Sequence, residues 1–312
     1  MPDKPYISIV IPVYNEEGNL RPLFERVYPV LQGTGKPFEI IFTDDGSSDR
    51  SLAILKKFTE EFPEVKVVEF NGNFGQHMAI LAAFEKSSGD IVITLDADLQ
   101  NPPEEIPKLV AEVEKGYDVV GTVRQKRQDT LFRKTASRIV NITTNKMTGM
   151  RMSDYGCMLR AYHRNVVDNI NRCQEATTFI PALAQTFAGN PGEVEVAHAE
   201  RAEGESKYSL YKLVRLNFDL MTGFSVVPLQ LFALFGIGTA LFSVAFAVFL
   251  LVRRFIVGAE VEGVFTLFAI LFFFIGITIL GIGIVGEYVG RVYQEVRKRP
   301  RYVVRRTYGF DE

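Results

Sequence analysis

Two aspartates and a glutamine lie close together, directly after an apolar run typical of a buried strand. Asp96 and Asp98 follow residues 91–95, and Gln100 comes two positions later. Carboxylate and amide oxygens suit Mg²⁺ or Mn²⁺, ions that commonly bind substrate phosphates as well. The spacing predicts a metal site serving a diphosphate leaving group by Lewis-acid catalysis, with Asp98 as the catalytic carboxylate. The alternative is that these carboxylates cap a helix beginning near Pro103.

A second polar group follows the apolar runs nearer the N-terminus and has the composition of a nucleotide pocket. Asp44 and Asp45 could hydrogen-bond a nucleobase and a ribose. A turn followed by a helix N-cap at Ser48 or Asp49 would use the same segment, and the two uses are compatible. The other side of the base pocket would come from three residues at the end of the first run: Pro12, Tyr14 and Glu16.

The residues after the third apolar run are expected to face the same ligand. Asn73 and Gln76 lie where a helix should begin, and free N–H groups at a helix start attract ribose or phosphate. His77 follows them, but a lone histidine at such a place is more often a cap or a surface residue. We therefore assign Asn73 and Gln76, together with Asp96, to the predicted nucleotide site.

Basic side chains are expected to bind the remaining phosphates. Arg124, Arg127 and Arg133 follow a run expected to form the neighbour of the metal strand, and they could hold a phosphorylated acceptor, although such a stretch is often only a solvated face. Lys207 suits a loop that closes over a diphosphate. Asp154, in a polar turn, would act as a base or only orient the acceptor or metal, because a phosphate monoester is mostly deprotonated at neutral pH.

The elements that must position these residues are strands alternating with amphipathic helices, an order that builds a mostly parallel sheet. The expected strands are 6–13, 38–42, 65–70, 90–95 and 117–123. In such a sheet ligands collect at the carboxyl ends of the strands, where the polar residues fall. No Gly-x-Gly-x-x-Gly follows the first strand, so a Rossmann-type dinucleotide site is not supported.

Two long uncharged runs, 220–252 and 263–286, exceed the roughly 20 apolar residues that a helix needs to cross a bilayer. Two buried helices of a soluble protein are the other interpretation. The chain opens directly into a strand pattern without a signal peptide, and the tail after the second run is rich in arginine, so we expect the first part and the tail on the cytoplasmic side of the membrane. Arg253 and Arg254 between the runs weaken this charge asymmetry.

These patterns divide the chain into four expected parts. They are a cytosolic α/β domain at 1–206, a basic amphipathic helix in the membrane interface at 207–224, two transmembrane helices within 225–290 and a cytosolic basic tail at 291–312. The balance of 35 basic to 37 acidic residues argues against a nucleic-acid partner.

Several short blocks resemble family 2 glycosyltransferases of the GT-A fold, in the branch that acts on polyprenyl phosphates. The resemblance covers essentially the whole chain. The blocks are 73–77 (NFGQH), 94–105 (TLDADLQNPPEE), 121–127 (GTVRQKR), 132–137 (FRKTAS), 154–162 (DYGCMLRAY), 178–181 (TFIP) and 204–209 (GESKYS). Of these, 121–127 and 154–162 resemble the members that transfer a modified arabinose.

This resemblance implies an inverting transfer of 4-deoxy-4-formamido-L-arabinose from a UDP-sugar donor to undecaprenyl phosphate, as in lipid A modification and polymyxin resistance. It places the metal at Asp96, Asp98 and Gln100 and implies a homotetramer. Lys207 would join the nucleotide-sugar site, and the three arginines would bind the lipid phosphate. Donor specificity remains open, because a hexosyltransferase could use the same scaffold.

Two other function classes fit less well. Processive polysaccharide synthases of the family carry a Gln-x-x-Arg-Trp element, and this chain contains no tryptophan. A non-catalytic nucleotide-binding membrane adaptor would not need the intact acidic cluster.

Overall fold

The chain divides into two compact units in the computed structural model. One comprises Met1–Tyr208 with Lys298–Glu312, and the other comprises Ser209–Arg297. The structure describes residues 4–124, 157–173, 179–196, 226–257, 264–297 and 299–310. Each unit is considered by itself.

The first unit is built on one eight-stranded sheet with the order β7-β5-β6-β4-β1-β2-β3-β8. Its strands are β1 (Ile7–Val13), β2 (Phe38–Asp44), β3 (Val65–Phe70), β4 (Ile91–Thr94), β5 (Val119–Arg124), β6 (Arg160–His163), β7 (Pro191–Val196) and β8 (Val304–Tyr308). β1 pairs in parallel with both β2 and β4, β2 with β3, and β5 with β7. β6 runs antiparallel to β4 and β5, and β8 runs antiparallel to β3. The mostly parallel sheet is therefore confirmed.

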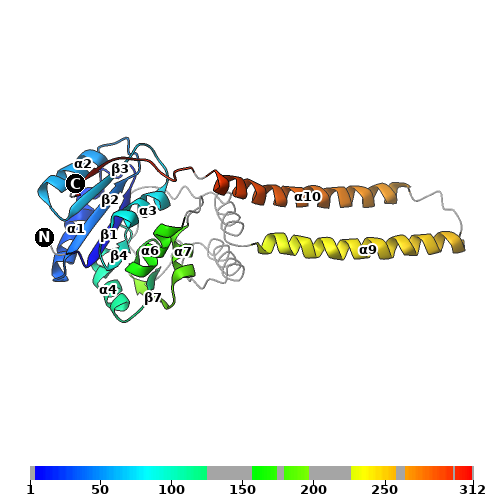
Figure 1. Cartoon of the computed structure of the whole chain (residues 1–312), viewed down its shortest axis with the longest axis horizontal. Coiled ribbons are helices and arrows are strands. Elements are labelled where there is room, and N and C mark those ends of the chain that lie inside the picture. Colours follow the sequence, from blue (N-terminus) through cyan, green and yellow to red (C-terminus); the bar gives the residue numbers. More distant parts are fainter. Residues whose placement is uncertain are drawn as a thin grey trace. The chain divides into compact units, whose positions relative to one another are not determined.

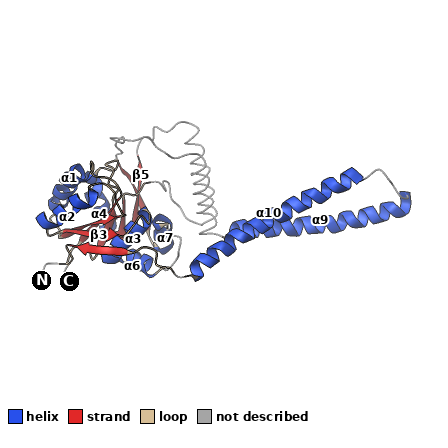
Figure 2. Ribbon diagram, turned by 90° about the horizontal axis from the view of Figure 1, so that it is seen from above, coloured by secondary structure: helices blue, strands red, loops and turns tan. Residues whose placement is uncertain are grey.

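Helices cover both faces of this sheet (Figures 1 and 2). α1 (Leu20–Gly33), α2 (Ser51–Glu61), the short 3₁₀ helix η1 (Pro103–Glu105) and α4 (Ile106–Glu114) form one layer. α3 (Gln76–Lys86), α6 (Arg164–Arg172) and α7 (Ile180–Phe187) form the other. This arrangement follows from the alternation of strand and helix, because crossovers between parallel strands pass over the faces of a sheet.

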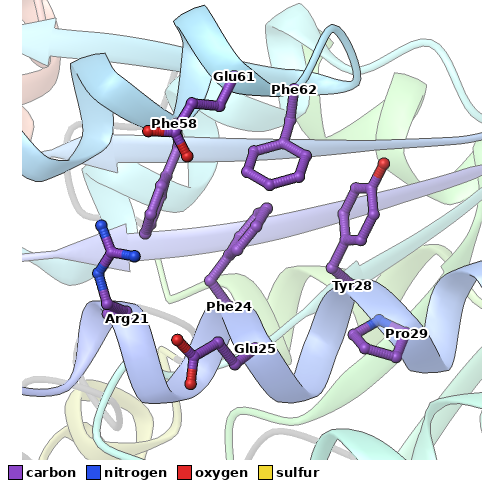
Figure 3. A pocket seen from close by; sticks show the side chains of 8 residues that line it. All are labelled: Arg21, Phe24, Glu25, Tyr28, Pro29, Phe58, Glu61 and Phe62. Carbon is purple, nitrogen blue, oxygen red and sulfur yellow. The ribbon is translucent and has the colours of Figure 1, made fainter.

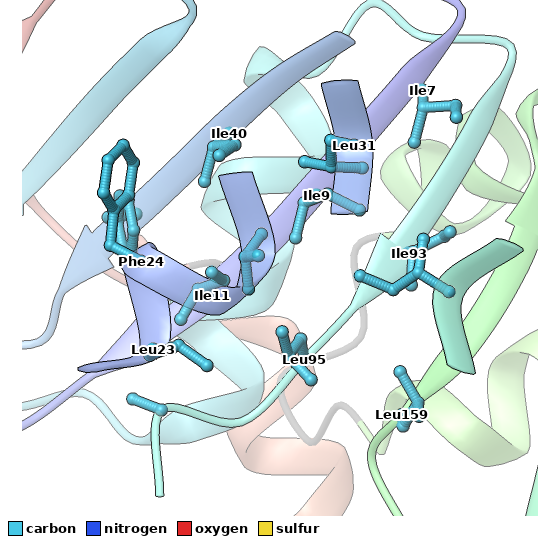
Figure 4. Packing of buried hydrophobic residues seen from close by; sticks show 14 of the residues in the cluster. Ile7, Ile9, Ile11, Leu23, Phe24, Leu31, Ile40, Ile93, Leu95 and Leu159 are labelled. Atoms are coloured by element: carbon cyan, nitrogen blue, oxygen red, sulfur yellow. The ribbon is translucent and has the colours of Figure 1, made fainter. Parts of the chain in front are cut away.

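The main core lies between the sheet and α1 (Figure 4). Alternate residues of β1, Ile7, Ile9 and Ile11, point to this face and are fully buried. Leu23 and Leu31 of α1 cover them, as a helix with apolar residues at three- and four-residue spacing should. This packing fixes the positions of β1 and β4, and therefore the positions of the polar residues that follow their carboxyl ends.

The sheet differs from the expected one at two strands. β5 was expected to neighbour the metal strand β4, but β6 lies between them. The tail, expected only as a basic flank, contributes β8 at the other edge. Both strands are short and carry charged residues, so neither shows the apolar run that marks a buried parallel strand.

The second unit contains two long helices, α9 (Val227–Val257) and α10 (Val264–Val296), the latter extending past the expected boundary at 290. Within them, Leu229–Phe246 has a mean hydropathy of 1.9 and Ile270–Val296 of 2.3, and almost none of either segment is buried. Both helices are long and apolar enough to cross a membrane. Their exposure argues against the core helices of a soluble protein.

Glu39, near the start of β2, provides a stability test remote from the strand ends that carry the predicted site. It is 2% exposed and accepts hydrogen bonds from Ser8 Oγ at 2.6 Å and Lys66 Nζ at 2.7 Å. Burial alone would raise the pKa of this carboxyl, but the bonds from Lys66, Ser8 and Ser88 outweigh it and hold that pKa below its usual value.

We expect Glu39→Gln to lower the free energy of unfolding by about 2 kcal/mol at pH 7. Because the folded-state pKa is lowered, this contribution is present above the unfolded pKa of about 4.3 and is lost as pH falls through the folded value. Thermal unfolding at pH 7 and at pH 3 measures it. A variant equally destabilised at both values would contradict the assignment.

Candidate functional site

The predicted site residues gather at the carboxyl ends of β1, β2, β3 and β4. β1 leads through α1 to β2 on one side, whereas β4 pairs with β1 on the other side. The loops after β1 and β4 therefore diverge, and this is the switch point where open α/β sheets bind ligands. Tyr14, after β1, is 49% exposed there.

The loop after β4 brings Asp98 and Gln100 together. Gln100 donates its Nε2 to Asp98 Oδ2 at 2.7 Å and its backbone N–H to Asp98 Oδ1 at 3.2 Å. Leu99 between them has φ of 62°, a left-handed conformation that a branched side chain rarely adopts. Its side chain packs against the core, which holds the turn in place.

The donor set of this loop fits a hard divalent cation. Asp96, Asp98 and Gln100 supply carboxylate and amide oxygens, and all three are partly exposed. In the described part of the chain, no group of three or more His, Cys, Asp or Glu side chains lies close enough together to hold a metal ion. A cation held by these three oxygens would have coordination positions left for water or substrate phosphate, as Mg²⁺ usually has.

The capping alternative for these aspartates is wrong. η1 begins at Pro103 after an N-cap at Pro102, and α4 follows with an N-cap at Glu105; neither start has a side-chain capping bond. Asp96 accepts instead from Gln76 Nε2 at 2.6 Å. This contact links the loop after β4 to the start of α3.

Asp45 holds the loop after β3. Its Oδ1 accepts the N–H of Phe74 at 2.6 Å, and its Oδ2 accepts the N–H of Gly75 at 2.9 Å. Burial raises the pKa of Asp45, and these two N–H groups partly offset the rise. Asp45 is 3% exposed, so the structure gives it a role in holding this loop in place.

Asp44 has a different environment although it is the adjacent carboxylate. Its Oδ2 accepts the Ser47 N–H at 3.3 Å, whereas its Oδ1 is buried with no hydrogen-bond partner among the described residues. Burial raises the pKa of Asp44, and the nearby charges of Glu69 and Asp49 raise it further. A buried acceptor without a partner costs free energy that an incoming N–H donor would recover.

The loops after β1 and β2 are locked to each other. Asn15, at φ of 56°, donates its N–H to Ser47 Oγ at 3.0 Å and accepts the Ser48 N–H at 2.8 Å. Glu16 donates its N–H to Ser51 Oγ at 2.9 Å. Tyr14 and Glu16 are therefore carried on a rigid double loop, with partly exposed Pro12 at its base.

The expected cap of α2 is misplaced by one or two residues. α2 begins at Ser51 with Arg50 in the N-cap position, so neither Ser48 nor Asp49 is the N-cap. Asp49 nevertheless accepts the Ser51 N–H at 2.9 Å and the Glu17 N–H at 3.1 Å. Its carboxylate serves the junction of the two loops as well as the helix start.

The start of α3 presents Gln76 and Asn73, both exposed. Its N-cap is Gly75, whose φ of 95° suits glycine and lets the chain turn from the loop into the helix. His77 is neither a cap nor a surface residue, because it packs edge-on against Phe179 with ring centroids 5.1 Å apart. Burial lowers the pKa of His77 to about 4, so its imidazole is neutral at pH 7.

Several predicted site residues lie outside the described residues. They are Asp154, Lys207, Arg127 and Arg133, together with the helix expected at 207–224. Arg124 is the last residue of β5, but its side chain is not described.

A cavity of about 300 Å³ lies between α1 and α2 (Figure 3). Its lining is mainly aromatic, and Phe24 stacks on Phe58 with ring centroids 4.4 Å apart. None of its lining residues is among the predicted site residues. We therefore attribute it to the packing of the two helices.

Gly46 gives a test of how closely the loops must pack. It has φ of 72°, and a Cβ there would lie 2.6 Å from the Gly72 carbonyl carbon. We expect Gly46→Ala to destabilise the fold by about 1–2 kcal/mol, because the loops after β2 and β3 must separate. Gly72→Ala is the matched control, since a Cβ at Gly72 meets nothing within 4 Å. Equal loss of stability in the two variants, measured by thermal unfolding, would count against this account.

Comparison with known proteins gives a family match and several similar full-length proteins. Residues 8–170 match the family model described as Glycosyl transferase family 2. Undecaprenyl-phosphate 4-deoxy-4-formamido-L-arabinose transferase of Pectobacterium atrosepticum is 53% identical over 305 residues, which is 96% of this chain and 93% of that protein. The protein of the same name from Yersinia enterocolitica is 53% identical over 98% of this chain and 94% of its own length.

A similar fold occurs in a solved structure of lower sequence similarity. Glucosyl-3-phosphoglycerate synthase from Mycobacterium tuberculosis, in complex with Mn²⁺, UDP-glucose and phosphoglyceric acid, superposes with a TM-score of 0.52 at 19% identity. The match covers 70% of this chain and 78% of that one. The comparison concerns the fold alone.

Proposed function

The chain belongs to glycosyl transferase family 2, and from that premise we propose that it transfers 4-deoxy-4-formamido-L-arabinose from UDP to undecaprenyl phosphate. The observation that carries the proposal is 53% identity, over nearly the full length, to transferases named for this sugar and this lipid. The acidic loop at the switch point supplies the chemistry that such a transfer needs.

In this proposal the metal is held by Asp96, Asp98 and Gln100. A bound Mg²⁺ or Mn²⁺ would neutralise charge developing on the leaving diphosphate. Leu99 forms the left-handed turn that brings Gln100 Nε2 to Asp98 Oδ2. Gln76 fixes the orientation of the Asp96 carboxylate. The protein's contribution is then positioning and electrostatics, which can supply most of the rate.

The donor nucleotide would occupy the three loops after β1, β2 and β3. The unpartnered Oδ1 of Asp44 suits the imide N–H of uracil. Asp45 shapes the floor of the pocket through its two backbone bonds. The side chains proposed to line the rest are Pro12, Tyr14, Glu16, Asn73 and Gln76, with Lys207 closing over the diphosphate.

The acceptor would arrive from the bilayer. Arg124, Arg127 and Arg133 are proposed to hold its phosphate, with Asp154 orienting the acceptor or acting as a base. α9 and α10 would cross the bacterial inner membrane and keep the catalytic unit on the cytoplasmic side. The proposed assembly is a homotetramer, which light scattering of the purified protein tests.

The deciding experiment offers the purified full chain undecaprenyl phosphate and either labelled UDP-4-deoxy-4-formamido-L-arabinose or labelled UDP-glucose, with Mn²⁺ and then with EDTA. Lipid-linked product from the arabinose donor alone, lost with EDTA, supports the whole proposal. Product from UDP-glucose alone would contradict the proposed donor sugar and leave the proposed mechanism of transfer in place. Absence of product from either donor would favour a non-catalytic nucleotide-binding protein.

A further inference from the structure

The strand that follows the apolar helices in sequence, β8, pairs with β3 at the end that leads into the proposed donor loop. β8 runs antiparallel to β3, with Val304 opposite Phe70. The pairing continues into the loop after β3, because Asn71 donates its N–H to the Val303 carbonyl at 3.1 Å. The tail thus contacts backbone that belongs to the pocket.

Aromatic contacts extend this link toward Asp45. Tyr302 stacks on Phe70 with ring centroids 5.0 Å apart and an interplanar angle of 16°. Phe70 in turn meets Phe74 edge-on, with centroids 5.5 Å apart and an angle of 88°. Phe74 is the residue whose N–H bonds to Asp45. Two ring contacts therefore separate Tyr302 from the bond that shapes the pocket.

Tyr302 also reaches α3, the helix whose first residue contacts the metal loop. Burial raises the pKa of Tyr302, and the Glu85 carboxylate that accepts its hydroxyl raises it further, so the hydroxyl stays protonated. Glu85 lies in the last turn of α3, and Gln76 at the other end donates to Asp96. Tyr302 bridges the end of β3 and the body of α3.

We propose that Tyr302 is a positioning residue that holds the loop 71–75 and the start of α3 in the geometry that binds the donor. The inference rests on the proposed function, since it assigns the loop to UDP. Pairing of β8 alone would only close an exposed sheet edge. The aromatic contacts go further, because offset-stacked and edge-on ring pairs fix the relative orientation of their side chains.

The test compares Tyr302→Ala with Tyr302→Phe in the purified full chain. Titration with UDP and Mn²⁺ gives affinity, and amide hydrogen exchange of residues 71–76 without ligand reports on the loop. We expect Tyr302→Ala to bind UDP about tenfold more weakly, and the amides of its loop to exchange faster. The reason is that Phe70 loses the ring stacked on it and no longer holds Phe74 in a fixed orientation. Tyr302→Phe keeps the stack and loses only the hydroxyl bonded to Glu85, so it should recover most of the UDP affinity lost in Tyr302→Ala.

Phe310→Ala is the matched control. Phe310 lies just beyond the other end of β8, where its ring faces Lys66 Nζ at 5.3 Å. The change removes an aromatic ring from the same tail, yet it should leave UDP affinity and loop exchange unchanged. If Tyr302→Ala does not fold, Tyr302→Leu, which retains side-chain bulk without the stack, replaces it.

Three results would overturn the inference. They are parental affinity and exchange in Tyr302→Ala, an equal loss in Phe310→Ala, and failure of Tyr302→Phe to restore binding. If the parent protein itself bound no UDP, that result would contradict the proposed function, whatever the variants did. The exchange measurement would still show whether Tyr302 holds the loop, so the two failures are distinguishable.

Discussion

Replacing Asp98 with Asn should abolish sugar transfer, with a fall in turnover of at least about 1000-fold. The substitution keeps the shape of the side chain and removes its charge. Asp98 is proposed to hold the metal that would neutralise the charge developing on the departing diphosphate. Because that charge is larger in the transition state than in the bound substrate, the loss should appear in kcat as well as in kcat/KM.

The measurement is turnover at saturating donor across a Mn²⁺ titration, with circular dichroism and chromatography to show that the fold is intact. Asp90→Asn is the matched control, because Asp90 immediately precedes β4 at its other end and pairs with Lys4 at 2.6 Å on the surface. It should retain parental turnover. Turnover equal to the parent in Asp98→Asn, or turnover that returns to the parental value at high Mn²⁺, would contradict the assignment of Asp98 as the catalytic carboxylate.

The buried parallel strands could be predicted from the sequence, and the antiparallel additions could not. The run ending at Val13 is apolar because helices cover both faces of β1, with α1 on one side and α3 on the other. β8 sits at the sheet edge and carries Arg305 and Arg306, so its side chains show no burial pattern. Its place depends on pairing with a strand more than two hundred residues away in sequence.

Residue type predicts a metal site in the loop after β4, but it could not separate the two adjacent carboxylates after β2. Asp44 and Asp45 look equivalent in sequence. They differ because the partners of Asp45 are backbone N–H groups 29 and 30 residues further along the chain. The turn at Leu99 had no sequence signal either, since leucine seldom adopts a left-handed conformation. Asn15 did have one, because asparagine tolerates that conformation.

Replacing Asp45 with Asn should lower kcat/KM for the donor by about 100-fold, even though the residue is not expected to touch the reacting atoms. An amide in its place offers one acceptor oxygen and an NH₂ group, so one of the N–H groups of Phe74 and Gly75 would face another donor. The loop must then move, and Gln76 with it. Because Gln76 contacts Asp96, the disturbance should reach the metal site as well as the nucleotide.

Steady-state kinetics and UDP titration measure the effect, and Asp118→Asn separates it from general destabilisation. Asp118 precedes β5 at the opposite end of the sheet, where its Oδ2 accepts the N–H groups of Gly189 at 2.9 Å and Asn190 at 2.8 Å. The same substitution there removes a charged acceptor far from the donor loops, so it should lower stability while donor kinetics stay near parental. If both variants lost the same activity, the effect of Asp45 would be one of stability alone. If Asp45→Asn kept parental kinetics, the loop after β3 would not be part of the donor site.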